Sequence, residues 1–447
     1  MTRIRENASV VRVGTAFAVI AAVLAAAGCG SSTGSTTATS ASAIAAALKG
    51  TTPGGRVSTS QCGRAPRAKA RGTPIRLGAI VTQQPGTDFT DITNMAAAYF
   101  ACVNANGGVN GHPILYEIET DQVNPGQIAA EAAKLVGDGA IGIVGSTDPI
   151  ECTVDHAYWQ HLGYDEIDAG IAPECYSTPN SAAINMGPRY STDGAVQYAI
   201  AQGAKTIVLD QANGPINAYL SGGSVSIAKA AHVPITVVQD NLPVQDPNSI
   251  ALRDIDAAGR NGAVVLDFAP PNALSILQAA QKLGLEDRVK LWGCSTPCDT
   301  DFLSQALGRK WDHKLFVNAE LLNPDTDNSP TVQLYKAILR QYGSKVRGGV
   351  GSFSEMGFAI AEITVHALDS IRGPYTARSV NQALKGVTNF DTGLLCRPWT
   401  YGNYPLHIPN NVDITVTPDR GRMVVAEGCT PISSVDPGVA DYRNASG

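Results

Sequence analysis

The sequence lacks several features that would assign it to a common class of enzymes. It has no Gly-x-Ser-x-Gly elbow, no Gly-x-Gly-x-x-Gly after a strand and no phosphate-binding loop ending in Gly-Lys-Ser/Thr. Its seven histidines are scattered without a spacing that indicates a site. The spacings of Cys152, His156 and His161 do not keep three ligands on one helical face, so zinc is not expected. We therefore expect no enzyme, no cofactor and no metal.

The chain also lacks an excess of basic residues and has only one long apolar run. A formal net charge of −6 argues against a nucleic-acid partner. The apolar run at 13–29 follows Arg3, Arg5 and Arg12 and ends at Cys29. It is too short for a stable membrane span and is typical of a secretory leader. It resembles a lipoprotein signal peptide, which implies cleavage after residue 28 and a lipid on Cys29.

Ordinary cleavage, which would give a freely secreted protein, is the alternative to lipidation. Either way, the protein is expected outside the cytoplasm. Residues 29–61 are predicted to be a flexible linker, because Gly30 to Ser42 are all Gly, Ser, Thr or Ala and cannot bury a core. No later run approaches the roughly 18 apolar residues of a spanning helix. Attachment to the outer face of the cell membrane is therefore expected through the lipid alone.

The sequence contains nine cysteines. If Cys29 carries a lipid, an even number remains in an oxidising compartment, which predicts a set of disulfides. Roughly a hundred pairings of eight cysteines are possible, and beyond the close pair Cys294 and Cys298 the connectivity stays open. Chain order favours Cys62 with Cys102, Cys152 with Cys175, Cys294 with Cys298, and Cys396 with Cys429.

From Pro74 onward, β-branched runs alternate with amphipathic stretches, which is typical of βαβ units around parallel sheets. Ten such strands are too many for one ordinary domain, so an α/β protein of two lobes is expected. The predicted strands are 75–81, 114–121, 140–145, 164–170, 182–187, 206–211, 235–240, 263–268, 289–294 and 315–321. Helices are predicted at 330–343, 353–371 and 376–385, followed by a hairpin within 413–427.

A family resemblance begins at Tyr99, where the chain reads YFACVNANGGVNGHPI. This helix, its Asn-Gly-Gly-Val-Asn-Gly turn and the following strand resemble extracellular solute-binding proteins of branched-chain amino-acid type ABC transporters. Three later segments resemble the same family in order: GIVGSTDPIECTV, GSFSEMGFAIAEITVHAL and LKGVTNFDTGLL. The resemblance covers about residues 74 to 430.

The resemblance implies a type I periplasmic-binding-protein fold. This fold has two Rossmann-like lobes with parallel central sheets, joined by three crossover segments, with the ligand cleft between the lobes. We expect the crossings near Gly187, Gly293 and Arg372. The predicted lobes are then 74–187 plus 295–371 for the first and 188–294 plus 372–447 for the second.

Candidate ligand contacts lie beyond the carboxyl ends of the predicted strands. The resemblance implies that hydroxyls of Ser146 and Thr147 bind a ligand carboxylate at a helix start, where the dipole favours an anion. Asp148 has an alternative role, because Asp-Pro-x-Glu before a helix predicts a capping box with Glu151. The first-lobe candidates are Gln84, Ser146, Thr147, Asp148, Gly170 and Ile171.

The sequence departs from the family at the fourth strand. Amino-acid binders of the family carry Ala-x-Thr there, and this chain has Gly170, Ile171, Ala172 and Pro173. One of the usual carboxylate donors is therefore missing.

On the second lobe, Asp210, Asp240 and Asp267 lie at the ends of three strands. Such a wall could pair with an ammonium group or accept hydrogen bonds from hydroxyls, and the alternative is that each acid caps a helix or supports a turn. Phe268 could stack on a ligand or fill the core. The second-lobe candidates are Asn213, Asp240, Asp267 and Phe268.

The sequence thus predicts a monomeric, membrane-tethered protein that captures a small polar solute, such as an amino acid, an amide or a polyol, between two lobes. Its expected partners are that small molecule and an ABC permease complex that imports it. The alternative is a ligand sensor or scaffold lipoprotein with the same fold and no transport role.

Overall fold

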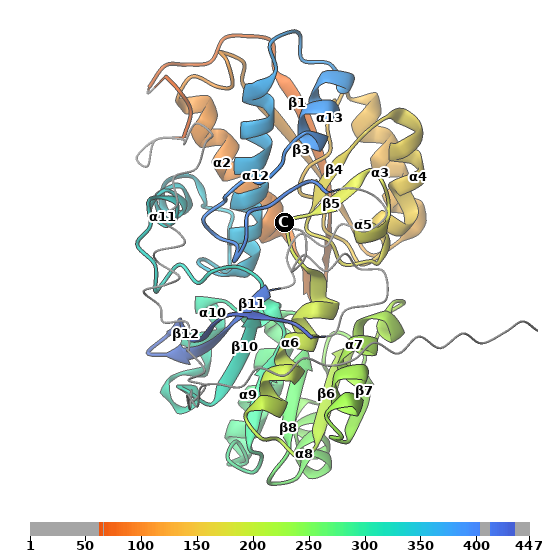
Figure 1. Cartoon of the computed structure of the whole chain (residues 1–447), viewed down its shortest axis with the longest axis vertical. Coiled ribbons are helices and arrows are strands. Elements are labelled where there is room, and N and C mark those ends of the chain that lie inside the picture. Colours follow the sequence, from red (N-terminus) through yellow and green to blue (C-terminus); the bar gives the residue numbers. More distant parts are fainter. Residues whose placement is uncertain (1–61, 66, 403–411, 434–447) are drawn as a thin grey trace, which may run out of the picture. The chain divides into compact units, whose positions relative to one another are not determined.

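The computed structural model describes residues 62–65, 67–402 and 412–433 (Figure 1). The predicted leader and the whole predicted linker, with Cys29, lie outside these residues. All described residues belong to one compact unit. Among the helices of this part of the chain, none has the length and hydrophobicity that a membrane span requires.

The first sheet is built around β1 (Ile75–Gln84), which pairs in parallel with β3 (Ile114–Asp121) and antiparallel with β2 (Thr87–Asp88). Two short strands, β4 (Glu166–Asp168) and β5 (Ser181–Ala183), pair with each other in parallel. The predicted strand at 140–145 forms only isolated bridges to β1 and β4. Gly145 has a φ of +89°, which interrupts the extended backbone at this point. The segment still lies parallel to β1, because the N–H groups of Ile141 and Val144 donate to the carbonyl oxygens of Arg76 and Gly78, so the predicted pairing is present without a regular strand.

Helices cover this first sheet from distant parts of the chain. They are α2 (Thr90–Ala105), α3 (Pro125–Gly137), α4 (Glu151–Leu162), α5 (Glu174–Ser177), α11 (Pro330–Tyr342), α12 (Ser352–Ser370) and α13 (Ala377–Lys385). The helices α2 and α12 lie side by side (Figure 1). Three of these helices, α11 to α13, agree within one residue with the predicted ranges.

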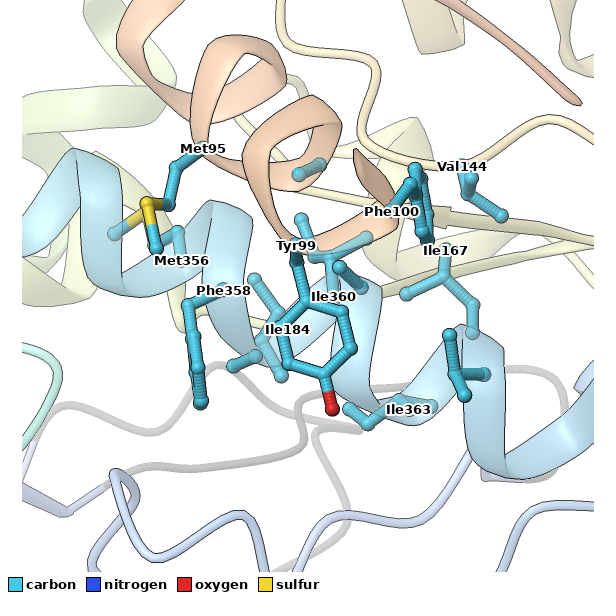
Figure 2. Close-up of a cluster of buried hydrophobic side chains, with 14 of the residues drawn as sticks. Met95, Tyr99, Phe100, Val144, Ile167, Ile184, Met356, Phe358, Ile360 and Ile363 are labelled. Carbon is cyan, nitrogen blue, oxygen red and sulfur yellow. The ribbon is translucent and has the colours of Figure 1, made fainter. Parts of the chain in front are cut away.

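The contact between α2 and α12 depends on a glycine. A Cβ at Gly357 would lie 2.0 Å from the carbonyl oxygen of Ile92, so only glycine lets the two backbones approach this closely. Figure 2 shows the side chains that fill the rest of the contact, among them Met95, Tyr99 and Phe358. The rings of Tyr99 and Phe358 meet edge to face, with centroids 5.1 Å apart.

The second sheet has seven strands in the order β12-β11-β10-β9-β8-β6-β7. Strands β6 to β10 run parallel, and β11 and β12 add an antiparallel hairpin at one edge. The strands are β6 (Ile207–Ala212), β7 (Ile235–Asp240), β8 (Ala263–Asp267), β9 (Leu291–Cys294), β10 (Leu315–Ala319), β11 (Val412–Asp419) and β12 (Arg422–Pro431). The helices around this sheet are α6 (Gly187–Ala201), α7 (Asn217–Ala230), α8 (Pro247–Ala258), α9 (Pro270–Leu283) and α10 (Asp301–Leu307).

Two segments lie in a different lobe from the one predicted. Strand β10 pairs with β9 and β11, although 295–371 was expected in the first lobe. Helix α13 contacts β4 and α12, although 372–447 was expected in the second lobe. Backbone hydrogen bonds to β9 place β10 in the second sheet. The fully buried side chains of Val380 and Leu384 place α13 in the core of the first lobe. The other lobe boundaries stay a prediction.

The passages between the sheets follow from these placements. The chain leaves β5 and enters α6 at Gly187, and it returns to the first core after Ala319. It crosses a third time between Tyr401, which is buried in the first core, and Val412, which begins β11.

Four disulfides join the described cysteines, in the order that the chain favours. Cys152–Cys175 joins α4 to α5, and Cys294–Cys298 closes the turn after β9. Cys62–Cys102 and Cys396–Cys429 are the other two bonds.

Candidate ligand-binding site

A cavity of about 450 Å³ lies where the carboxyl ends of strands from both sheets meet. Residues that end or follow β1, β4, β5, β6, β8, β9 and β10 line it. Parallel strands carry their loops to one edge of the sheet, and this edge is the usual ligand position in open α/β folds. Most of the lining is apolar, and the polar side chains are concentrated at a few points.

The first-lobe wall of the cavity is mainly hydrophobic. Thr147 bridges to β1, Ala169 and Ile171 follow β4, and Phe89 and Ile92 come from the start of α2. The Cys152–Cys175 disulfide joins the helices that follow the loops of Thr147 and Ile171. The covalent bond thus ties the two halves of this wall together.

The second-lobe wall carries a chain of asparagines. Asn217 Nδ2 donates to Asn213 Oδ1 at 3.4 Å, and Asn213 Nδ2 donates to Asn241 Oδ1 at 2.8 Å. On the same wall, Asp267 ends β8 and Phe268 follows it. Ser295 Oγ donates to Asp267 Oδ1 at 2.7 Å, and burial raises the pKa of this carboxyl to about 6.

The floor of the cavity lies where the chain passes between the sheets. Glu320 lines it and follows β10, with a side chain only 3% exposed. Its Oε2 accepts the backbone N–H groups of Met186 and Gly187, at 2.7 and 3.0 Å. Burial raises the pKa of Glu320 to about 7, against the lowering effect of these hydrogen bonds. Asn185 and Thr296 lie on the same floor.

Sequence reasoning missed Asn185, Thr296 and Glu320. Glu320 lies within the predicted strand 315–321 and was treated as part of it. An acid near the end of a mostly apolar strand run was the available signal. Asn185 likewise lies inside the predicted strand 182–187, whereas the observed strand ends at Ala183.

The structure brings six of the predicted contacts to this cavity and leaves four outside its lining. The six are Gln84, Thr147, Ile171, Asn213, Asp267 and Phe268. The four are Ser146, Asp148, Gly170 and Asp240, and each has a physical reason to lie elsewhere.

Ser146 and Gly170 serve the interior of the first lobe. The Ser146 side chain is 1% exposed, and its Oγ accepts the N–H of Ile80 at 3.3 Å. The carbonyl oxygen of Gly170 accepts hydrogen bonds from Tyr176 Oη at 2.6 Å and from Asn185 Nδ2 at 3.1 Å. The Gly170 carbonyl therefore orients Asn185, which lies on the cavity floor.

Asp148 is buried behind Thr147 and accepts hydrogen bonds from the Thr82 hydroxyl and from the N–H of Ile150. Burial, with a further contribution from Asp121, raises its pKa to about 7. The predicted capping box is wrong, because α4 begins at Glu151 after Ile150 and has no side-chain cap. Glu151 Oε1 accepts instead from Trp159 Nε1 at 3.1 Å.

Asp240 is held by a cation of its own lobe. Arg253 on α8 donates to both carboxylate oxygens of Asp240, at 3.1 and 2.8 Å. The same guanidinium contacts Asp210 at 2.8 Å. The acids at the ends of β6 and β7 therefore bind a structural arginine, and among the three predicted strand-end acids only Asp267 reaches the cavity.

A second cavity of about 300 Å³ adjoins the first. Both cavities are lined by Gln84, Thr87, Pro297 and Phe353, which form the partition between them. The larger cavity is the stronger candidate, because the strand ends of both sheets converge on it.

Two α/β units with parallel strands, and a largely apolar cavity between their carboxyl ends, define a two-lobed receptor for small molecules. The chain belongs to the periplasmic binding protein family, whose family model matches residues 74–404. This confirms the predicted family and the α/β fold with parallel sheets. The family is a class of extracytoplasmic binding proteins and not of enzymes.

Solved structures with the same fold include three binding proteins that are named for different ligands. A fatty acid ABC transporter substrate-binding protein from Thermomonospora curvata is 16% identical, with a TM-score of 0.67 over 82% of this chain and 94% of its own. A branched-chain amino acid ABC transporter protein from Thermus thermophilus with bound valine is 16% identical, with a TM-score of 0.68 over 81% and 98%. A solute-binding protein from R. palustris in complex with 4-hydroxybenzoate is 17% identical, with a TM-score of 0.66 over 82% and 99%.

At these identities the matches show the shared fold. Among curated proteins, none matches the sequence.

Proposed function

We propose that this protein captures a small solute in the cavity between its lobes and delivers it to an ABC importer. The observation that carries the proposal is the cavity itself, which receives the strand ends of both sheets and has a polar floor within apolar walls. The names of the three structures above support a small-molecule ligand and an ABC transporter partner.

Closure of the lobes over the solute is the proposed mechanism. A ligand that contacts both walls interacts better with the closed form, and it shifts the population toward that form by no more than the difference in affinity. Glu320 lies at the passage between the sheets and contacts both the cavity and the backbone of Gly187. A solute bound to the floor therefore touches the segment about which the lobes would move.

The solute fits the cavity best as a molecule with an apolar body and a few hydrogen-bonding groups. Ile92 and Phe268 offer apolar contacts from opposite lobes, while Asn213 and Glu320 offer polar groups. We further propose that Cys29 carries the lipid, that the protein acts as a monomer at the outer face of the cell membrane, and that Cys152–Cys175 pre-orders one wall. A pre-ordered wall lowers the entropic cost of binding.

Thermal unfolding of the full oxidised chain tests the proposal. The chain is screened with amino acids, amides, polyols, sugars, amines and aromatic acids, because a ligand of the folded state must raise its apparent stability. A saturable shift with one chemical class supports solute capture. A well-folded protein that is free of co-purified ligand and shows no shift contradicts it.

Uptake of the same solute separates transport from sensing. Deletion of the gene is expected to abolish uptake of the radiolabelled solute, and a copy of the wild-type gene is expected to restore it. Unchanged uptake would contradict the transport role and favour a sensor.

A further inference from the structure

We infer that the cavity selects a positively charged solute without a carboxylate, and that Asn185, Asp267 and Glu320 hold its cationic group. This inference rests on the proposed function, because it names the ligand class of the same cavity. It also separates this protein from the two structures above that contain valine and 4-hydroxybenzoate.

The charged side chains of the cavity all have one sign. Asp267 and Glu320 are acidic, and among the described residues that line the cavity there is no lysine, arginine or histidine. An ionised carboxylate taken out of water needs a countercharge or several donors. A ligand carboxylate would meet two acids and no base in this cavity, whereas an ammonium or amidinium group would meet its complement.

The donors that were expected for a ligand carboxylate are used inside the first lobe. Ser146 Oγ accepts the N–H of Ile80, and Thr147 Oγ1 donates to the carbonyl oxygen of Ser146 at 2.8 Å. At the start of α4, where a ligand anion was expected, the Asp148 carboxylate already binds the backbone: its Oδ1 accepts the N–H of Ile150 at 2.6 Å. The missing threonine after the fourth strand removes a further donor. Neither of the two hydroxyls that were expected to bind a ligand carboxylate is therefore available to donate to it.

The floor also holds an acceptor without a donor. Asn185 is 4% exposed, and its Nδ2 donates to the carbonyl oxygen of Gly170, which fixes the orientation of the amide. The Oδ1 atom of Asn185 is buried and has no hydrogen-bond partner. Buried polar atoms are nearly always paired in native proteins, so a ligand donor at this position explains the orphaned oxygen.

An ammonium group has three donors and no acceptor, and an amidinium group likewise only donates. Asn185 and Glu320 on the floor and Asp267 on the second-lobe wall offer an amide oxygen and two carboxylates, which match that pattern. The apolar walls would hold an aliphatic or aromatic body. The ligand class is therefore an amine or amidine with an apolar body.

Matched probes that differ only in their polar group test this selectivity. The first set is 3-methylbutan-1-amine, leucine amide, 3-methylbutan-1-ol, leucine and 4-methylpentanoate. The second set, with an aromatic body, is 2-phenylethylamine, 2-phenylethanol and 3-phenylpropionate. Calorimetric titration of the full chain at pH 7.5, above the pKa of Asp267 and of Glu320, is expected to give the amines and the amide at least about tenfold tighter binding than the alcohols, and weaker binding still for leucine and the two acids.

Tighter binding of a carboxylate than of its matched amine, or a solute from the wider screen that binds through a carboxylate, overturns the inference and leaves the proposed function standing. Equal binding of alcohol and amine also overturns it. If neither probe set nor the wider screen shows any binding, the proposed function fails together with the inference.

Variants separate a role in binding from a role in folding. Glu320→Gln and Asp267→Asn are each expected to weaken the amine about tenfold or more and the matched alcohol less than threefold. Asn185→Leu removes the unpaired acceptor and provides a second test if an acid variant fails to fold. Asp256→Asn, on the exposed face of α8, is the charge-matched control and is expected to change neither affinity. Equal losses for amine and alcohol, or an effect of Asp256→Asn as large as that of Glu320→Gln, would contradict the assignment.

Discussion

Raising the pH from mildly acidic to mildly alkaline is expected to destabilise this protein, because several buried acids hold their protons in the folded state. Burial raises the pKa of Asp299 and of Glu320 to about 7, and that of Asp267 to about 6. The ordinary pKa of the Glu320 carboxyl is 4.5. The folded protein therefore keeps a proton that the unfolded chain releases first.

The sign and size of the effect follow from this difference. The stability that protonated Glu320 contributes is complete below its unfolded pKa and is lost as the pH rises through its folded pKa. Between these two values one such group removes about 1.4 kcal/mol for each pH unit. From pH 5 to pH 7 Glu320 alone would thus lower the free energy of unfolding by about 2 to 3 kcal/mol.

Urea unfolding at pH 5, 6, 7 and 8, followed by tryptophan fluorescence, measures this dependence. The free energy of unfolding of the wild-type chain is expected to fall with rising pH. The Glu320→Gln variant cannot titrate at this position. Its free energy of unfolding is expected to fall less steeply with pH, by the equivalent of about one bound proton. A free energy that stays constant or rises toward pH 8, or an unchanged slope in Glu320→Gln, would refute the account of these buried acids.

Three further predictions concern packing, covalent links and charge. Gly357→Ala is expected to destabilise the fold by about 2 kcal/mol or more, because its Cβ meets the backbone of α2. A Tm within a degree of that of the wild type would show that α2 and α12 can move apart without cost. The double variant Cys152→Ser and Cys175→Ser opens a loop of 23 residues, and its free energy of unfolding is expected to fall by about 3 kcal/mol. Unchanged stability and unchanged solute affinity would show that the disulfide does not order this wall of the cavity. Arg253→Met leaves three acids, Asp210, Asp240 and Asp254, without their cation and is expected to lower stability by about 2 kcal/mol. The solute affinity of the folded variant is expected to stay unchanged, and a loss larger than tenfold would show that Asp240 contributes to binding.

The regular elements were largely predictable from the sequence. The strands at 114–121 and 235–240 have the predicted bounds, because β-branched runs between turn signals identify parallel strands well, even at the sheet edges where both of these lie. The hairpin around Pro418 to Gly421 was equally clear from its turn residues. Gly357 lies in a segment that carried the family resemblance, and the structure gives its physical reason in the close approach of α2 and α12.

The assignment of elements to lobes and of acids to roles was less predictable. An apolar strand such as 315–319 fits either sheet, and only its hydrogen-bonded neighbours decide which one it joins. Asp240 and Asp267 both end strands, yet an arginine on α8 binds the first and the second lines the cavity. Such outcomes depend on contacts between segments distant in the chain, and local sequence patterns do not carry this information.

The most direct test of the central claim compares solute binding to the wild-type chain and to a variant with a blocked cavity. Ala212 ends β6 and lines the cavity, so Ala212→Trp would fill it from the edge without removing a polar contact. The solute identified by thermal shift is expected to raise the Tm of the wild-type protein saturably and to leave the Tm of folded Ala212→Trp unchanged. An equal shift in both proteins would place the binding site elsewhere and contradict the account.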